Sequence, residues 1–125
     1  MKLFRIADNR FHLALSKLSN IQLPLKTAFK LKGIMKIVRE EFAKYDEVRK
    51  EAIQKHALKK PDGSIKVDDN DNATFSDKGM KAFVAEINEL GSLEVEVPTI
   101  KLSELSGLTL TLEEAELLDT LIIED

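Results

Sequence analysis

The chain has 125 residues, of which 43% are hydrophobic and 33% are charged, with no cysteine and a net charge of −3. This length predicts a single domain over residues 1–125 with a modest core, and the lack of cysteine excludes disulfides and thiolate metal ligands. No run of about 18 apolar residues is present, and the first residues lack the hydrophobic region of a signal peptide, so we expect a cytoplasmic protein with no membrane partner.

The two halves of the chain carry opposite charge. Residues 1–60 hold 15 of the 19 basic residues and 6 of the 22 acidic ones, so the remaining 4 basic and 16 acidic residues lie in residues 61–125. No acidic residue stands between Asp8 and Glu40. This asymmetry favours attraction between the halves, within one chain or head to tail between chains, over a polyanionic partner such as nucleic acid.

The first part of the chain predicts a short strand and two helices. Residues 3–6 alternate weakly and favour a strand. Asp8 or Asn9 is placed to cap a helix over residues 10–18. Pro24 then suits the first turn of a long helix that runs to about residue 59, because its missing amide proton would be unpaired there.

The long helix is the most informative element of the sequence. At about 1.5 Å per residue it is about 50 Å long, longer than a domain of this size is wide, so it must project from its own core or be covered by another chain. Its apolar residues recur at alternating steps of three and four over residues 28–45, which is coiled-coil spacing. Arg49 and His56 interrupt this stripe, so residues 48–59 are the part that we expect to protrude or to pair.

Two further features of the long helix bear on its packing. A second row, Leu25, Phe29 and Ile34, widens the apolar face that we expect to lie on the core. Gly33 stands within the pattern and predicts a bend or a close contact with another helix.

After the long helix we expect a tight turn, a loop and another helix. Pro61, Asp62 and Gly63 suit the turn, and residues 64–67 suit a short strand or hairpin arm. Residues 68–75 are expected to form a mobile loop. A helix over residues 76–90 then ends at Gly91.

The last part of the chain predicts a strand and a closing helix. Hydrophobic and glutamate residues alternate over residues 93–97, and Pro98 places this strand at a sheet edge. Thr111 and Glu114 form a capping box for a helix over residues 112–123. The whole chain therefore predicts an α+β, helix-dominated fold, with one long helix, three shorter helices and a small two- or three-stranded sheet.

The polar loop resembles a calcium site only in part. Asp68, Asn70 and Asn72 stand at alternate positions, as the first ligands of an EF-hand do. However, Ala73 stands where glycine is needed, and Gly79 stands where a glutamate would ligate the ion. We therefore expect a solvated loop and no metal.

Catalytic patterns are missing from the sequence as a whole. His12 and His56 do not lie in a metal-binding spacing, and there is no Ser-His-acid set and no glycine-rich phosphate loop. Paired carboxylates such as Glu94 and Glu96 are explained by solvated faces. We expect no enzymatic activity and no cofactor.

The candidate partner-binding residues lie on the long helix. Basic residues flank its apolar stripe in rows one turn apart, without the stacking aromatics of a nucleic-acid site. A protein partner, a second copy or a different protein, is favoured over nucleic acid, and a homo-oligomer is expected. The residues predicted to contact this partner are Lys26, Lys30, Lys32, Lys36, Arg39, Phe42, Tyr45, Arg49 and His56.

Two stretches of the chain carry a resemblance to a known family. They are LSKLSNIQLPLKTAFKLKGIMKIVREEFAKYDEVRKEAI running into KKPDGS, and VEVPTIKLSEL before the final helix. Their order resembles that of small phage-encoded proteins grouped as a family of unknown function. The acid-rich loop at residues 68–72 and the missing acids before Glu40 depart from that pattern.

The resemblance implies a viral accessory protein without catalytic residues, which acts in the host-cell cytoplasm. Such a protein would bind another protein, for example to inhibit a host or defence protein. Two alternatives stay open: a virion assembly or structural component that forms an oligomer, and a nucleic-acid-binding protein that uses the basic N-terminal half.

Overall fold

The computed structural model describes residues 1–105 and 107–124 and confirms the predicted α+β, helix-dominated fold. Its short parallel sheet pairs Ile100 with Ile122. The elements in chain order are α1 (Leu3–Ala7), α2 (Asn9–Ser19), α3 (Leu25–His56), α4 (Asp77–Gly91), β1 (Ile100–Lys101), the 3₁₀ helix η1 (Leu102–Leu105), α5 (Leu112–Leu117) and β2 (Ile122–Ile123).

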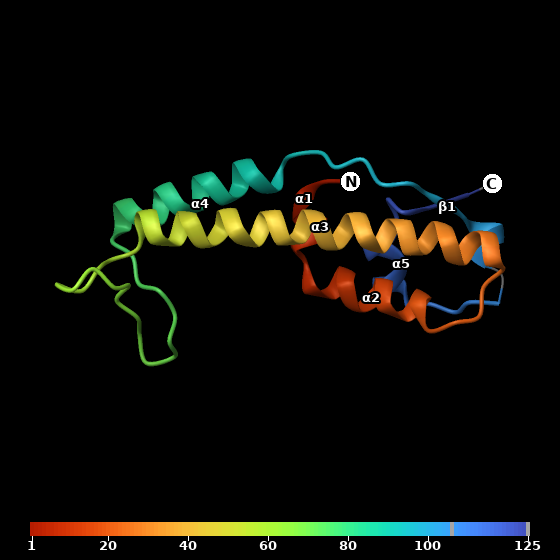
Figure 1. Cartoon of the computed structure of the whole chain (residues 1–125), viewed down its shortest axis with the longest axis horizontal. Helices are drawn as coiled ribbons and strands as arrows, with labels where there is room; N and C mark the ends of the chain where they lie inside the picture. The colour runs from red at the N-terminus through yellow and green to blue at the C-terminus, as the bar shows by residue number, and fades with distance from the viewer. Residues whose placement is uncertain (106, 125) are drawn as a thin grey trace.

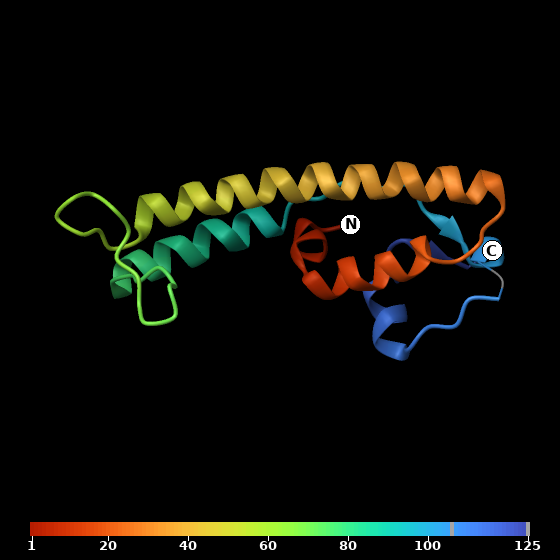
Figure 2. The same cartoon turned by 60° about the horizontal axis from the view of Figure 1, so that its bottom comes forward.

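Helix α3 runs the length of the structure, and the other elements lie along it (Figure 1). The core lies against its first half, where α1, α2, α5 and the sheet gather (Figure 2). The residues of α3 that are buried there are Leu31, Ile34 and Val38. Of the apolar stripe predicted over residues 28–45, Leu31 and Val38 are buried, whereas Ala28 and Phe42 are exposed. Pro24 caps the helix, which begins one residue later and ends three residues earlier than predicted.

The second half of α3 is covered by α4 of the same chain, a possibility that the sequence prediction did not include. The two helices run antiparallel, side by side (Figures 1 and 2). Gly79 makes this approach close, because a Cβ there would lie 2.7 Å from the carbonyl oxygen of His56. The same end is held by Glu86, which accepts hydrogen bonds of 2.9 Å from Lys55 and from Nε2 of His56.

Two sequence predictions about packing on α3 need correction. Of the two roles predicted for Gly33, the close helix contact is wrong, since a Cβ there would meet nothing within 4 Å, and the bend stays a prediction. Leu25 and Phe29 do not lie on the core, as 74% and 64% of their surfaces are exposed, whereas Ile34 is fully buried. These two residues point away because they are out of phase with the buried stripe of α3.

The predicted strand at residues 3–6 is also wrong, because these residues form helix α1. Leu3 and Ile6 are both buried, and their spacing of three residues places them on one helical face rather than on opposite faces of a strand. Asp8 then caps α2 by accepting a hydrogen bond from the backbone of Arg10, as predicted.

The C-terminal part forms less regular structure than predicted. Residues 93–97 make only an isolated bridge from Glu94 to Lys2 instead of a strand. The capping box of Thr111 and Glu114 is confirmed, but α5 ends at Leu117. The chain then turns so that Leu118 and Leu121 are fully buried, and β2 pairs with β1. A helix continued to residue 123 could not make this pairing.

The loop between α3 and α4 lies at the far end of the structure from the core (Figure 1). Gly63 has a positive φ of 89°, as the predicted tight turn requires, and a bridge joins Lys59 to Ile65. Within the acid-rich part, Asp68 accepts hydrogen bonds from the backbone of Asn70 and Asn72. The mobility of residues 68–75 stays a prediction.

Candidate protein-binding surface

The acidic C-terminal segment, residues 102–105 and 107–119, lies on the basic N-terminal half of the same chain. Four ion pairs link the two, at distances of 2.9 to 3.6 Å: Lys17 with Glu114, Lys30 with Glu104, Arg10 with Glu113, and Arg5 with Asp119. The attraction between the oppositely charged halves therefore acts within one chain for this segment.

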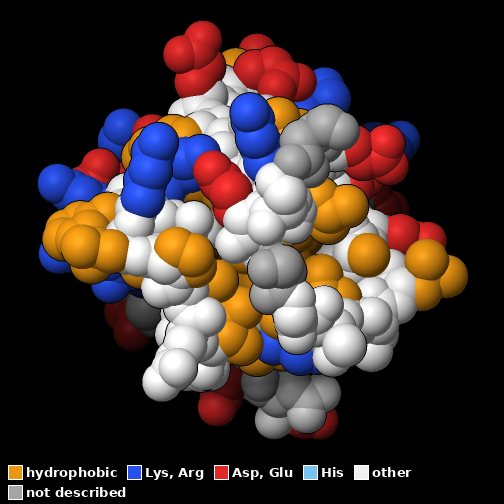
Figure 3. All heavy atoms as spheres, turned by 90° about the vertical axis from the view of Figure 1, so that its right-hand side faces the viewer, with side chains coloured by type: hydrophobic (Ala, Val, Ile, Leu, Met, Phe, Trp, Pro, Cys, Tyr) orange, Lys and Arg blue, Asp and Glu red, His pale blue; other side chains and the backbone are white. Residues whose placement is uncertain are grey.

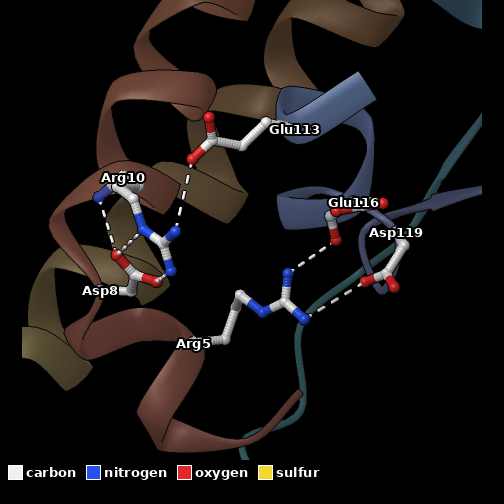
Figure 4. Close-up of polar contacts among 6 residues, drawn as sticks. All are labelled: Arg5, Asp8, Arg10, Glu113, Glu116 and Asp119. Carbon is white, nitrogen blue, oxygen red and sulfur yellow. Dashed lines mark hydrogen bonds and ion pairs between the residues drawn. The ribbon is translucent and has the colours of Figure 1, made fainter. Parts of the chain in front are cut away.

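Two of these ion pairs, Arg10 with Glu113 and Arg5 with Asp119, lie around a hollow of about 510 Å³ between α1, α2 and α5 (Figure 4). Arg5 donates a 2.7 Å hydrogen bond to the carbonyl oxygen of Glu116. Arg10 donates to both carboxylate oxygens of Asp8, and this hydrogen bonding lowers the pKa of Asp8. Both arginines of the hollow are thus engaged within the chain, so the hollow offers no unpaired cation to a ligand.

Glu114 joins two parts of this segment. Its carboxylate accepts the backbone N–H of Thr111 and a 2.9 Å hydrogen bond from Lys17. These donors lower the pKa of Glu114, with the backbone of Thr111 contributing most. The residue therefore completes the capping box of α5 and attaches that helix to α2.

On the other side of the α2–α3 pair lies an apolar groove that nothing in the described chain covers. It measures about 230 Å³ and adjoins a second hollow of about 210 Å³, with which it shares Ala28 and Lys32. We call the two together the α2–α3 surface. Its principal lining residues are Leu18, Ile21, Leu23, Leu25, Ala28, Phe29, Leu31, Lys32, Met35 and Arg39.

The exposed part of the α2–α3 surface is apolar with a basic rim. Hydrophobic side chains lie beside Lys and Arg side chains on this end of the molecule (Figure 3). The ammonium of Lys32 lies 6.0 Å from the ring centroid of Phe29. Lys32 and Arg39 form no ion pair within residues 1–105 and 107–124, and Lys36 lies one turn beyond Lys32.

The start of α3 adds to the positive potential of this end. The first turn of α3 contains no acidic residue, and Pro24 contributes no side-chain hydrogen bond to the free backbone N–H groups. The positive end of the helix dipole is therefore uncompensated next to Leu25 and Phe29. Negative charge is favoured beside this surface.

The structure separates the predicted partner-binding residues into two groups. Lys26, Lys32, Lys36 and Arg39 are exposed along the first half of α3, and of these Lys32 and Arg39 line the groove, whereas Lys26 and Lys36 lie outside it. The remaining ones contact their own chain: Lys30 pairs with Glu104, Phe42 meets the ring of His12 edge-on, Tyr45 packs on the core, Arg49 pairs with Asp46, and His56 bonds to Glu86. Partner binding by these residues stays a prediction.

Several residues of the α2–α3 surface were not predicted from the sequence. Leu25 and Phe29 were assigned to the core, and the connector residues Ile21 and Leu23 were not assigned at all. A signal was available for the helical pair, because Leu25 and Phe29 are four residues apart on a face opposite to Leu31 and Val38. No comparable signal marked the connector, whose position depends on how α2 folds back on α3.

Comparison with protein-family models, curated proteins and solved structures gave no match. Among the described residues, no helix has the length and apolar character needed to cross a membrane. The same residues include no group of three or more acidic or histidine side chains placed to hold a metal ion.

Proposed function

We propose that the chain is a non-enzymatic protein-binding module that contacts its partner through the α2–α3 surface. The exposure of Leu25 and Phe29 next to an apolar groove carries the proposal. Contiguous apolar surface with a polar rim is typical of protein interaction sites, and aromatic and arginine residues are enriched there.

The groove suits side chains of a protein better than it suits a free small molecule. The groove and the hollow beside it measure about 230 and 210 Å³, each below the range of about 300–1,000 Å³ that small-molecule sites occupy, and such sites bury most of their ligand. A partner protein can fill the groove with one or two side chains and cover Phe29 with its neighbouring surface.

The resemblance to small phage-encoded proteins gives this proposal a biological setting. In that setting the chain is an accessory protein, and its partner is a host protein or a protein of the host's defence. Binding to that protein would inhibit it.

The proposal is tested by comparing what three forms of the protein retain from a lysate of the cells in which it acts. The surface variant is Leu25→Asp with Phe29→Asp, and the matched control is Leu112→Asp, which replaces a leucine that is 78% exposed on α5. We expect a protein that wild type and control retain and the surface variant loses. Equal retention by all three forms would contradict the proposal.

A second candidate function, self-assembly into a structural oligomer, is favoured by α4. This helix leaves Met80 and Val84, one turn apart, 43% and 44% exposed on the same face. A second copy that covered this stripe would build a larger helical bundle. Size-exclusion chromatography with light scattering tests it: an oligomer that Val84→Glu dissociates supports assembly, and a wild-type monomer at micromolar concentration rules it out.

A further inference from the structure

We infer that the partner segment bound by the α2–α3 surface is acidic and contains leucine, an inference that rests on the proposed protein-binding function. It concerns the chemistry of the partner and not only the place where it binds. Three observations support it: the way the chain binds its own C-terminal segment, the shape of the groove, and the uncompensated charge around it.

The chain already binds one segment of this chemistry. The described residues of the C-terminal segment lie against α2 and α3, with Leu105 buried and Leu108 and Leu110 packed on the core. Carboxylates of the same segment reach a lysine of each helix, Glu104 to Lys30 and Glu114 to Lys17. Leucines therefore fill the apolar surface of the α2–α3 pair while glutamates bond to its lysines.

The uncovered groove offers the same combination to a segment from another molecule. Apolar side chains, among them Leu23 and Met35, line it, and Lys32 and Arg39 stand at its edge. A leucine in the groove would bring adjacent carboxylates next to these two cations, as Leu105 and Glu104 are adjacent in the segment bound within the chain.

The positive charge of this surface favours a partner segment with negative charge. Lys32, Lys36 and Arg39 lack acidic partners among the described residues, and the start of α3 adds its dipole. Complementary potential raises the association rate and disfavours partners of like charge. Nucleic acid is also anionic, but Phe29 is a single ring beneath Lys32, whereas strand binding uses successive stacking rings.

The probe is a fluorescein-labelled synthetic peptide with the sequence of residues 102–118, added to the whole protein. Its control is the same peptide with Glu104, Glu113, Glu114 and Glu116 changed to Gln. The tethered segment holds its own site at an effective concentration of about millimolar, so a micromolar peptide reports on the uncovered groove.

Two protein variants test whether the peptide binds at the groove. Lys32→Glu with Arg39→Glu changes the groove, and Lys44→Glu with Lys50→Glu makes the same change of net charge on exposed residues elsewhere on α3. We expect fluorescence anisotropy to show binding to wild type and to the Lys44/Lys50 control. The affinity falls about tenfold or more for the groove variant and for the glutamine peptide.

Three outcomes overturn the inference: no binding of the acidic peptide to wild type, equal affinity of the two peptides, or equal affinity of the two double variants. A labelled single-stranded oligonucleotide that binds more tightly than the peptide, and loses affinity in the groove variant, would show that nucleic acid is the partner. If the peptide fails but the lysate comparison still depends on Leu25 and Phe29, the partner chemistry is wrong and the proposed function stands. If both fail, both proposals fall.

Discussion

Two glycines in the helices differ in what a side chain would meet. A Cβ at Gly79 would lie 2.7 Å from the backbone oxygen of His56, and a backbone atom cannot move aside as the end of a side chain can. A Cβ at Gly33 would have open space around it. Gly79 therefore allows α4 to approach α3, whereas Gly33 weakens α3 without giving a contact in return.

Alanine at these two positions is expected to act in opposite directions. Gly33→Ala raises the free energy of unfolding by about 1 kcal/mol, because alanine loses less backbone entropy in a helix. Gly79→Ala lowers it by about 1–3 kcal/mol, since the overpacking outweighs the gain in helix propensity. Urea denaturation measures both, and a stabilised Gly79→Ala variant would show that α3 and α4 are not this close.

At the scale of elements, α5 is held by its cap as much as by packing. Glu114 lies at the third position of α5, where it bonds back to the Thr111 backbone and across to Lys17. Both contacts stabilise the ionised carboxylate more than the neutral carboxyl group, and this lowers the pKa of Glu114. The docking of α5 is therefore sensitive to acid.

The pH dependence of stability tests this role. A carboxyl whose pKa is lower in the folded state stabilises the fold above its unfolded value of about 4.5, and this contribution is lost as the pH falls through the folded value. In Glu114→Gln the decline in the free energy of unfolding below about pH 4.5 is expected to be shallower than in wild type. Parallel pH curves for the two proteins would contradict this prediction.

Helix α4 is expected to be the least stable of the long elements. Gly91 is the only one of its residues that is fully buried, whereas α2 buries Phe11, Ala14, Leu15 and Leu18. Elements with few buried apolar contacts open locally at lower free energy. Native-state hydrogen exchange followed by NMR is predicted to show faster exchange in α4 than in α2, and equal protection of the two helices would count against it.

At the scale of the whole molecule, opposite charge brings the two ends of the chain together, but apolar burial holds them. The ion pairs of Arg10 with Glu113 and of Arg5 with Asp119 lie at the surface, where such pairs contribute little, whereas those of Lys17 and Lys30 are part-buried. Leu118 and Leu121 of the same region are fully buried. The charge pattern is therefore better suited to selecting which surfaces meet than to stabilising the fold.

Two substitutions separate these contributions. Leu118→Ala is expected to lower the free energy of unfolding by about 2–5 kcal/mol, because it leaves a cavity in the core. Arg10→Gln, which removes the surface ion pairs with Glu113 and with Asp8, is expected to change it by less than about 1 kcal/mol. Chemical denaturation compares them, and the opposite order would mean that charge holds the segment.

The helices were predicted from the sequence more accurately than the way they pack against one another. The period of α3, the helices α2 and α4 and the capping box of α5 depend on neighbouring residues, and all were found where expected. The partner of residues 48–59 was not predicted, because an apolar stripe specifies that something must cover it and not which helix does so. The strands predicted at residues 3–6 and 93–97 were wrong for a related reason, because strand pairing joins residues that are distant in the chain.

The candidate site shows the same division. Lys32, Lys36 and Arg39 were predicted from their charge and spacing, which are local properties of α3. Leu25 and Phe29 were placed on the wrong side, and Leu23 was missed, because the groove exists only once α2 has folded back against α3. The exposure of these three residues depends on the tertiary structure, so no local sequence pattern predicts it.

The central claim, that the α2–α3 surface binds an acidic segment that contains leucine, is tested most directly by NMR. The labelled protein is titrated with the acidic peptide of residues 102–118, and the backbone amide shifts are followed for the whole chain. The structure predicts shifts concentrated in residues 18–39, with α4 and the loop before it unchanged. Shifts centred on α4 or on α5, or no shifts at all, would contradict it.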